Sequence, residues 1–288
     1  MDLLETTDCW SIADVQKTCE MAALNGCGTI VVDSHESTPE YLRLIRSAGF
    51  YVISRDDLSL SPFPCQMVIN GNLDAENLSY KSSSGDTQFL LGTKYMVLGK
   101  QFEEQTPRLN STSVKNVLVI LGGADPRDLM PRLLSYLDNL PEDFKVTAVI
   151  GDFFGNIASV ESSAKSANRP VRLVYSPPSI FTLMAEADLT ISAAGQTLYE
   201  LACVGCPTVA FSIAANQKTH LAMMEDTGVL VSAGDADVDD VVSKSGMSLS
   251  TLMADNDKRE AMTAAGQKLI DGKGAQRVAR KIVSEIRA

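Results

Sequence analysis

The sequence predicts an α/β protein with two parallel-sheet domains. Short apolar runs rich in β-branched residues recur along its 288 residues, and segments with helical periodicity separate them. This alternation is typical of parallel strands joined by crossover helices. A polar stretch without periodicity, residues 103–115, divides the two halves and predicts an interdomain linker. We therefore expect an N-terminal domain over residues 1–108 and a C-terminal domain over residues 114–288.

The first half contains three predicted strands and one predicted helix. In chain order these are the strand 29–35, the helix 39–50, the strand 51–57 and the strand 67–72. Each strand runs into polar or turn residues, which read Asp-Ser-His, Asp-Asp and Asn-Gly-Asn. Polar side chains are thus expected at the carboxyl edge of a first sheet.

The second half alternates strands and helices more regularly. The predicted strands are 116–123, 144–151, 171–177, 188–195, 206–213 and 229–234. The predicted helices are 126–140, 180–187, 196–205, 220–228 and most of 250–288. Pro126 suits a first helical turn, and Gly228 suits a helix end. Right-handed units bring all of these strand ends to one edge, where open α/β sheets bind ligands.

Composition excludes several classes of protein. Apolar residues make up 45% of the chain, which is enough to bury a sizeable core. The net charge of −11 argues against a nucleic-acid partner or an anionic membrane surface. No apolar run reaches transmembrane length, and the acidic N-terminus has no secretory segment, so we expect no membrane insertion. The six scattered cysteines form no disulfide framework, which favours a cytoplasmic protein.

Cys203 and Cys206 have the C-x-x-C spacing that redox and zinc sites use. No second Cys/His pair lies near them in the sequence, and they fall in an apolar turn between a helix and a strand. We expect both thiols to pack in the core, and we expect no metal and no cofactor.

Two glycine-bearing turns carry the functional prediction, because each lies between a strand end and a helix. Glycine lets backbone N–H groups approach an anion closely, and a helix N-terminus favours negative charge. A threonine hydroxyl can bind a phosphate oxygen, and a glutamate one turn later can accept hydrogen bonds from a ribose. This is the outline of a site for a sugar nucleotide. The residues expected there are Gly122, Gly123, Asp125, Gly195, Gln196, Thr197 and Glu200.

The same turns have a simpler interpretation as helix caps and packing devices. Asp125 in particular either caps its helix or orders the loop around a diphosphate. The sequence has neither the G-x-x-x-x-G-K-[S/T] phosphate loop nor a G-x-G-x-x-G motif. ATPases and Rossmann dehydrogenases are therefore disfavoured.

The order of motifs resembles the sugar-nucleotide hydrolases of the pseudaminic acid pathway. The motifs are LGGADP, DLTISAAGQTLYELACVGCPTVAF, the pair NQ and DGKGAQRVA, with VVDSH, SRDD, VINGN and LLGTKYMVLGKQF in the first half. The resemblance implies cleavage of UDP-2,4-diacetamido-2,4,6-trideoxy-β-L-altropyranose. It also implies the two Rossmann-like domains (GT-B) of the related peptidoglycan N-acetylglucosaminyltransferase.

The sequence departs from this family at its start. Family members begin with a strand and a G-x-G-H-x-x-R loop, whose histidine is the expected catalytic group. This sequence lacks that loop and begins roughly 50 residues into the family pattern, on the order of one or two βα units. We therefore expect an incomplete N-terminal domain, whose exposed apolar edge predicts either a homodimer or marginal stability.

Four polar residues are weighed for the sugar side of the site. His35 follows a strand end, where it either holds or activates water, contacts the ligand, or is a solvated loop residue. His220 is expected to be a solvated first-turn residue. The resemblance implies that Asn216 and Gln217 reach the sugar or the phosphates, and the alternative is loop capping. His35 and Asn216 are the two candidates for catalysis.

Carboxylates near the first strand ends are weaker candidates. Asp56 and Asp57 are adjacent on a strand and point to opposite faces, so they do not form a dyad without a turn. We expect them to cap or to lie in a solvated turn, and Asp33 is similar, with a cleft-facing carboxylate as the alternative.

Three functions are compatible with these residues. The first is hydrolysis of a UDP-sugar by water, with backbone amides stabilising the departing diphosphate. The second is a glycosyltransferase that uses the same donor with an acceptor in place of water. The third is a sugar-nucleotide-binding subunit without turnover.

Overall fold

The computed structural model describes residues 9–34, 36–104 and 107–286. Two compact units make up the chain: Met1–Val97 with Lys273–Ala288, and Leu98–Gly272. This division differs from the predicted ranges 1–108 and 114–288 in its boundary and in the place of the last helix. That helix, α10 (Gly274–Ile286), groups with the first unit because its Val278 packs against the core of the first sheet.

Four parallel strands form the sheet of the first unit, in the order β1-β2-β3-β4. Their bounds are β1 Thr29–Asp33, β2 Tyr51–Arg55, β3 Met67–Asn70 and β4 Gln88–Leu91. The helices of this unit are α1 Ile12–Leu24, α2 Pro39–Ser47 and α10, with single 3₁₀ turns at Ala75–Asn77 and Thr93–Tyr95. The sequence prediction contained β1, β2, β3 and α2, but not α1 or β4.

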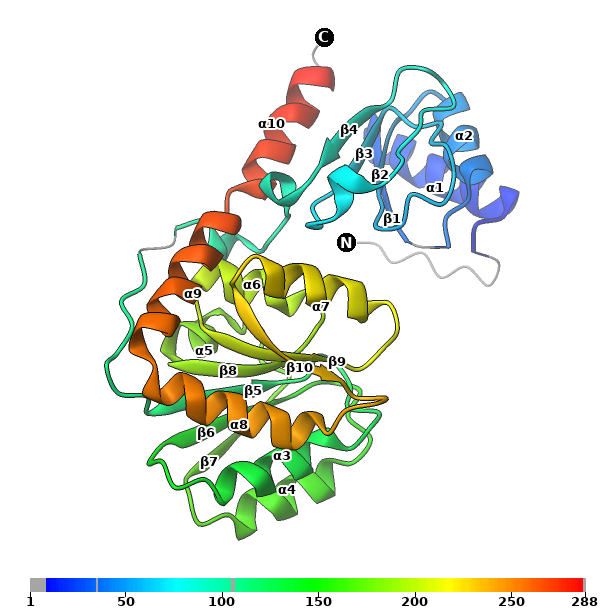
Figure 1. Cartoon of the computed structure of the whole chain (residues 1–288). Coiled ribbons are helices and arrows are strands. Elements are labelled where there is room, and N and C mark those ends of the chain that lie inside the picture. Colours follow the sequence, from blue (N-terminus) through cyan, green and yellow to red (C-terminus); the bar gives the residue numbers. More distant parts are fainter. Residues whose placement is uncertain (1–8, 35, 105–106, 287–288) are drawn as a thin grey trace. The chain divides into compact units, whose positions relative to one another are not determined.

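Successive strand residues point to opposite faces of this sheet, and both faces are packed. Val52 and Val68 face a cluster that includes Ile45 of α2. Ile53 and Met67 face the cluster that contains Val278 of α10. Figure 1 accordingly draws α10 beside β4, although the two are far apart in the sequence.

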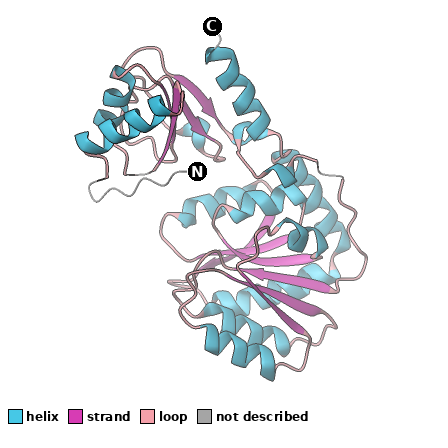
Figure 2. Cartoon of the chain, turned by 180° about the vertical axis from the view of Figure 1, so that it is seen from behind, coloured by secondary structure: helices cyan, strands magenta, loops and turns pink. Residues whose placement is uncertain are grey.

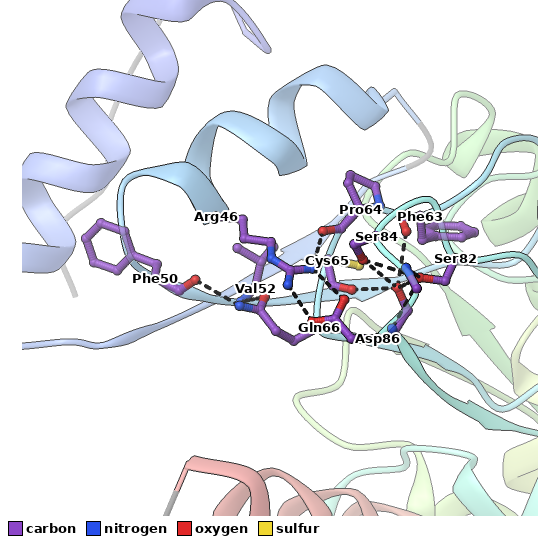
Figure 3. Close-up of polar contacts among 12 residues, drawn as sticks. Arg46, Phe50, Val52, Phe63, Pro64, Cys65, Gln66, Ser82, Ser84 and Asp86 are labelled. Carbon is purple, nitrogen blue, oxygen red and sulfur yellow. Dashed lines mark hydrogen bonds and ion pairs between the residues drawn. The ribbon is translucent and has the colours of Figure 1, made fainter.

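Arg46 of α2 ties this helix to the loops that precede β3 and β4 (Figure 3). Its Nη1 donates to the Pro64 carbonyl at 2.8 Å and to Asp86 Oδ1 at 3.0 Å, and its Nη2 lies 2.5 Å from Asp86 Oδ2. The Gln66 side-chain oxygen accepts from Val52 N at 2.8 Å. The guanidinium holds the pKa of the Asp86 carboxyl at about 2, below its ordinary value of 3.8.

Replacing Asp86 by asparagine should lower the free energy of unfolding of the first unit by roughly 0.5–1 kcal/mol at pH 7, because the ion pair is partly exposed. Because the pKa of Asp86 is lower in the folded protein, its carboxylate stabilises the folded state above pH 3.8, and this contribution is lost as pH falls toward 2. The difference in free energy of unfolding between Asp86→Asn and wild type should therefore shrink in acid. The fluorescence of Trp10 during urea unfolding measures this, since it is the one tryptophan and it packs on Tyr41 of α2. Glu40→Gln, which breaks an exposed pair with Arg43, is the matched control and should show little change. A constant offset from pH 7 to pH 2 would contradict the assignment.

Six parallel strands form the sheet of the second unit, in the order β10-β9-β8-β5-β6-β7. Their bounds are β5 Asn116–Ile120, β6 Lys145–Ile150, β7 Val171–Tyr175, β8 Leu189–Ala193, β9 Thr208–Ser212 and β10 Leu230–Asp235. Helices cover both faces (Figure 2). They are α3 Leu129–Asp138, α4 Ile157–Ser166, α5 Phe181–Glu186, α6 Thr197–Val204, α7 Gln217–Asp226, α8 Val241–Ala254 and α9 Asn256–Leu269, with a 3₁₀ turn at Lys100–Phe102.

All six predicted strands of this half are confirmed, and α4 is a helix that the prediction lacked. The predicted start of α3 at Pro126 is wrong, since the helix begins at Leu129. The reason is the Asp125 carboxylate, which accepts hydrogen bonds from the backbone N–H groups of Leu129 and Met130. That cap sets the first helical residue three positions after the proline.

The polar stretch predicted as a linker is partly bound to the second unit. The Arg108 guanidinium donates to the carbonyls of Met184 and Ala187, and Asn110 Nδ2 donates to Thr263 Oγ1 at 2.8 Å. The polar residues at 108 and 110 therefore bind groups of the second unit, and this part of the stretch is not a flexible linker.

Arg259 of α9 anchors the same stretch from inside the second unit. Its side chain is 1% exposed. Its Nη1 donates to the carbonyls of Leu252 and Met253, at 2.7 and 3.0 Å. Its Nη2 donates to the carbonyls of Ser111 and Thr112 and to Asn256 Oδ1, at 2.8, 3.3 and 2.9 Å. One buried cation thus joins the end of α8, the start of α9 and the residues before β5.

Candidate functional site

A hollow of about 280 Å³ lies at the carboxyl edge of the second sheet, within the second unit. It forms where the loops after β5, β8 and β9 meet. Both predicted glycine turns contribute to it, together with Thr197 and Gln217. The lining residues are Leu121, Gly122, Gly123, Ala124, Pro126, Ala193, Gly195, Thr197, Ile213 and Gln217.

The first turn brings backbone rather than side chains to the hollow. Gly122 has φ +87°, a left-handed conformation that other residues rarely adopt, and Gly123 is exposed. The Gly123 carbonyl accepts from Phe153 N at 2.9 Å, which fixes the turn against the loop after β6.

Asp125 has the capping role, one of the two that the sequence left open. It is 5% exposed, and its two carboxylate oxygens accept from Leu129 N at 2.9 Å and Met130 N at 2.7 Å. These amides at the start of α3 already have an anionic partner within the chain. An anion in the hollow would therefore meet the loop amides of the first turn instead of the N-terminus of α3.

The second turn leads directly into α6. Ala194 N donates to the Phe211 carbonyl at 2.9 Å, which ties the turn to β9. Gln196, the N-cap residue of α6, makes no side-chain capping hydrogen bond. Thr197 is its first residue and lines the hollow, whereas Gln196 is exposed and is not part of the lining. The N-terminal end of α6 thus presents its dipole and a hydroxyl at the hollow.

Glu200 lies one turn into α6, half-buried and outside the residues that line the hollow. Burial raises the pKa of its carboxyl from 4.5 to about 7. A carboxyl with this pKa changes charge near neutral pH, so it accepts or donates a hydrogen bond depending on pH.

Replacing Glu200 by glutamine should stabilise the protein at pH 8 and not at pH 4. Because the pKa of Glu200 is higher in the folded protein, the contribution of its neutral carboxyl to folding stability is complete below pH 4.5 and is lost as pH rises through about 7. Glutamine stays neutral at every pH and avoids this loss. After discounting for partial exposure we expect a gain of about 1–2 kcal/mol at pH 8. Melting temperatures of the variant and wild type across this range measure it. Glu186→Gln, an exposed carboxyl on α5, is the control, and equal differences at both pH values for Glu200→Gln would refute the expectation.

The amide pair divides into one lining residue and one exposed residue. Gln217 lines the hollow, and its Oε1 accepts from Ile213 N at 2.9 Å, which leaves the Nε2 group as the donor toward a ligand. Asn216 is exposed at the start of α7 and does not line the hollow. Gln217 therefore caps the loop after β9 through its side-chain oxygen, as the alternative interpretation predicted, and it also lines the hollow.

The two histidines have different outcomes. His35 lies outside the described residues. The expectation that His220 is solvated is wrong, because its ring is half-buried against Tyr199, with centroids 5.0 Å apart and Nδ1 3.4 Å from the tyrosine hydroxyl. An aromatic partner on the neighbouring helix α6 explains this, and local sequence gives no sign of it.

The carboxylates of the first unit are held separately. Asp56 Oδ2 accepts from Ser59 N and from the Tyr80 hydroxyl, each at 2.7 Å, whereas Asp57 Oδ1 accepts from Asn72 Nδ2 at 2.9 Å. The predicted turn role is confirmed, and the two do not act as a dyad. Asp33, the third of these carboxylates, forms an ion pair with Arg55 at 3.0 Å.

The thiols Cys203 and Cys206 are both buried, and Cys206 Sγ lies 3.1 Å from Thr190 Oγ1. Their predicted packing role is confirmed. In the described part of the chain, no group of three metal-ligating side chains is found, and none of the helices has the length and apolarity to cross a bilayer.

The chain is similar to proteins named for polysaccharide and pseudaminic acid biosynthesis, and it spans less than two thirds of the length of each. SpsG of Bacillus subtilis (strain 168), named as a spore coat polysaccharide biosynthesis protein, is 28% identical over 201 residues, 67% of this chain and 58% of its own length. The Helicobacter pylori protein named "Pseudaminic acid cytidylyltransferase and UDP-2,4-diacetamido-2,4,6-trideoxy-beta-L-altropyranose hydrolase" is 26% identical over 212 residues, 73% of this chain and 38% of its own length. No protein-family profile matches the chain.

Solved structures show the same fold. MurG of Acinetobacter baumannii superposes with a TM-score of 0.67 at 16% identity, over 95% of this chain and 78% of its own. MnaA of S. aureus, solved with UDP, gives 0.64 at 12% identity, over 95% and 80%. The predicted pair of Rossmann-like domains of the GT-B type is therefore confirmed, and so is the resemblance to the sugar-nucleotide hydrolases of the pseudaminic acid pathway.

Proposed function

We propose that the chain binds the UDP part of a UDP-sugar in the hollow of its second unit and hydrolyses that sugar nucleotide. The product would serve the biosynthesis of a nonulosonic acid such as pseudaminic acid, or of a surface polysaccharide. The observation that carries this proposal is the convergence of both glycine turns and the start of α6 on one hollow of about 280 Å³. The names of SpsG and of the H. pylori protein support the choice of pathway, and the UDP bound to MnaA supports the choice of nucleotide.

Each residue near the hollow has a part in this proposal. Backbone amides of Gly122 and Gly123, the first amides of α6 after Gly195 and the hydroxyl of Thr197 would bind the diphosphate, whereas Gly195 N donates to the Ala193 carbonyl at 2.9 Å. Glu200 would accept hydrogen bonds from the ribose, which requires its carboxylate form. Gln217 and, from the loop before it, Asn216 would contact the sugar. Asn216 is the proposed catalytic candidate of this unit, and His35, which lies outside the described residues, stays a candidate from the sequence alone.

The reaction exchanges one bond for another at the sugar. A water oxygen bonds to the anomeric carbon, and the bond from that carbon to the UDP oxygen breaks. The electron pair leaves on the β-phosphate, and one proton of the water is released. Backbone amides and the α6 dipole would stabilise the negative charge that develops on the β-phosphate in the transition state. They would stabilise it more strongly than the charge already present in the bound substrate, which accelerates cleavage of the bond to UDP.

Calorimetry with UDP, with CMP as the control nucleotide, tests the site before any chemistry is assumed. Binding of UDP in preference to CMP is expected, and absence of UDP binding at millimolar concentration would overturn the proposal. UDP release from a UDP-amino-sugar in water alone is then expected. Release that requires an added acceptor would instead identify a glycosyltransferase, and binding without release a subunit without turnover.

A further inference from the structure

Two cations lie beside the hollow, on residues next to its lining in the sequence. Arg127 follows Pro126, and Lys218 follows Gln217. Arg127 Nε also donates to the carbonyl of Ile213, a lining residue, at 3.2 Å. The guanidinium is therefore fixed at the rim by a backbone contact. Local sequence patterns did not single out either cation, because neither belongs to a glycine motif.

Both cations are matched by carboxylates of an acidic turn, residues 235–239, which starts at the last residue of β10 and precedes α8. Arg127 Nη2 pairs with Asp237. Lys218 Nζ pairs with Asp235 and lies 3.8 Å from Asp237. Asp237 is thus the carboxylate that both cations share.

The acidic turn has a rigid base and an exposed tip. Asp235 N donates to Asp239 Oδ2 at 2.8 Å, and Asp239 N donates to the Asp235 carbonyl at 2.7 Å. Gly234, at φ +95°, allows the chain to turn there. The side chain of Asp235 is 14% exposed, whereas that of Asp237 at the tip is 42% exposed. Asp237 can therefore rotate into solvent while the base of the turn stays in place.

We propose that Arg127 and Lys218 bind the diphosphate and that Asp237 competes with it for them. This inference rests on the proposed function, since it assumes that UDP occupies the hollow. A diphosphate carries more charge than one carboxylate and accepts paired hydrogen bonds from a guanidinium. An exposed ion pair is weak, so its exchange for a diphosphate is favourable. In a chain of net charge −11 these cations also offset the repulsion that a diphosphate would meet.

Titration calorimetry with UDP tests the inference on the full chain. Asp237→Asn should tighten UDP binding by about threefold to tenfold, and Arg127→Gln should weaken it by about tenfold or more. In the double variant Arg127→Gln/Asp237→Asn, most of the gain in UDP affinity from Asp237→Asn should be lost. Without the guanidinium, the Asp237 carboxylate has no arginine to keep from the diphosphate. Uridine, which lacks phosphate, should bind all variants with equal affinity.

The matched control is Asp143→Asn, which removes one exposed carboxylate paired with Lys115, away from the hollow. This variant changes the net charge by the same amount as Asp237→Asn. An equal gain in UDP affinity in both variants would show that the effect comes from net charge alone, and it would overturn the inference. Unchanged UDP affinity in Asp237→Asn would overturn it as well. Absence of UDP binding by wild type would instead overturn the proposed function. Arg127→Lys is the conservative variant of Arg127→Gln. It should keep a wild-type melting curve and part of the affinity for UDP, which separates loss of binding from a folding defect.

Discussion

Replacing Arg259 by methionine should lower the free energy of unfolding of the second unit by about 2–4 kcal/mol. Methionine fills much of the same space but donates no hydrogen bonds. The carbonyls of Leu252, Met253, Ser111 and Thr112 then lose the guanidinium donor, and of these residues Leu252 is buried and Met253 partly buried. An unpaired acceptor away from water costs free energy, and the tie between the end of α8 and residues 111–112 is lost as well. Circular dichroism during urea unfolding of the full chain measures the change, and the melting temperature of this unit should fall by on the order of 10 °C.

Lys258→Met is the matched control, since Lys258 is the exposed neighbour of Arg259 on the same helix. It should change stability by less than about 0.5 kcal/mol. Arg259→Lys keeps the charge but not the planar set of donors, so its stability should fall between wild type and Arg259→Met. Equal stability of Arg259→Met and Lys258→Met would show that the buried guanidinium does not hold these segments together.

Replacing Gly195 by leucine should weaken UDP binding by about a hundredfold or more while leaving the fold intact. Gly195 lines the hollow, and a Cβ added there meets no atom within 4 Å. Its φ lies outside the left-handed region, so a side chain adds no backbone strain. The leucine would therefore occupy the space that the proposal gives to the diphosphate, and calorimetry with UDP together with a melting curve measures both effects.

Gly155→Leu is the control for this variant, because Gly155 also has open space around its added Cβ and an ordinary backbone but does not line the hollow. It should bind UDP as wild type does. If Gly195→Leu keeps wild-type affinity with an unchanged melting temperature, the diphosphate does not lie at this turn.

Strand positions were predictable because a buried parallel strand needs a continuous apolar run, and the neighbouring turns need glycine or polar residues. The runs at β5, β8 and β9 show this, and their glycine turns do meet at one hollow. β4, Gln88–Leu91, was not predicted: it has one buried residue, Leu90, whereas all four residues of the equally short β3 are buried. α3 starts at Leu129 because of Asp125, and a proline three residues earlier is a weaker signal than that carboxylate.

The site itself was predictable only in part. Gly122, Gly195 and Thr197 follow from the backbone requirements of a strand-to-helix turn. The pairing of Arg127 and Lys218 with Asp237 joins residues about 20 to 110 positions apart, and no local pattern encodes such a contact. The same holds for His220 against Tyr199 and for Arg259 against residues 111–112.

By itself, the sequence determined the α/β class, the positions of the strands other than β4 and the two glycine turns that meet at the hollow. These follow from periodicity and from the conformational freedom of glycine, which are local properties. Only the tertiary structure decided that α10 belongs to the first sheet, that Asp125 caps α3, and that two cations and an acidic turn lie at the rim of the hollow. The physical reason is that burial, hydrogen-bond partners and charge pairing depend on which segments the fold brings together, and side-chain atoms interact over a few ångströms whatever their separation in the chain.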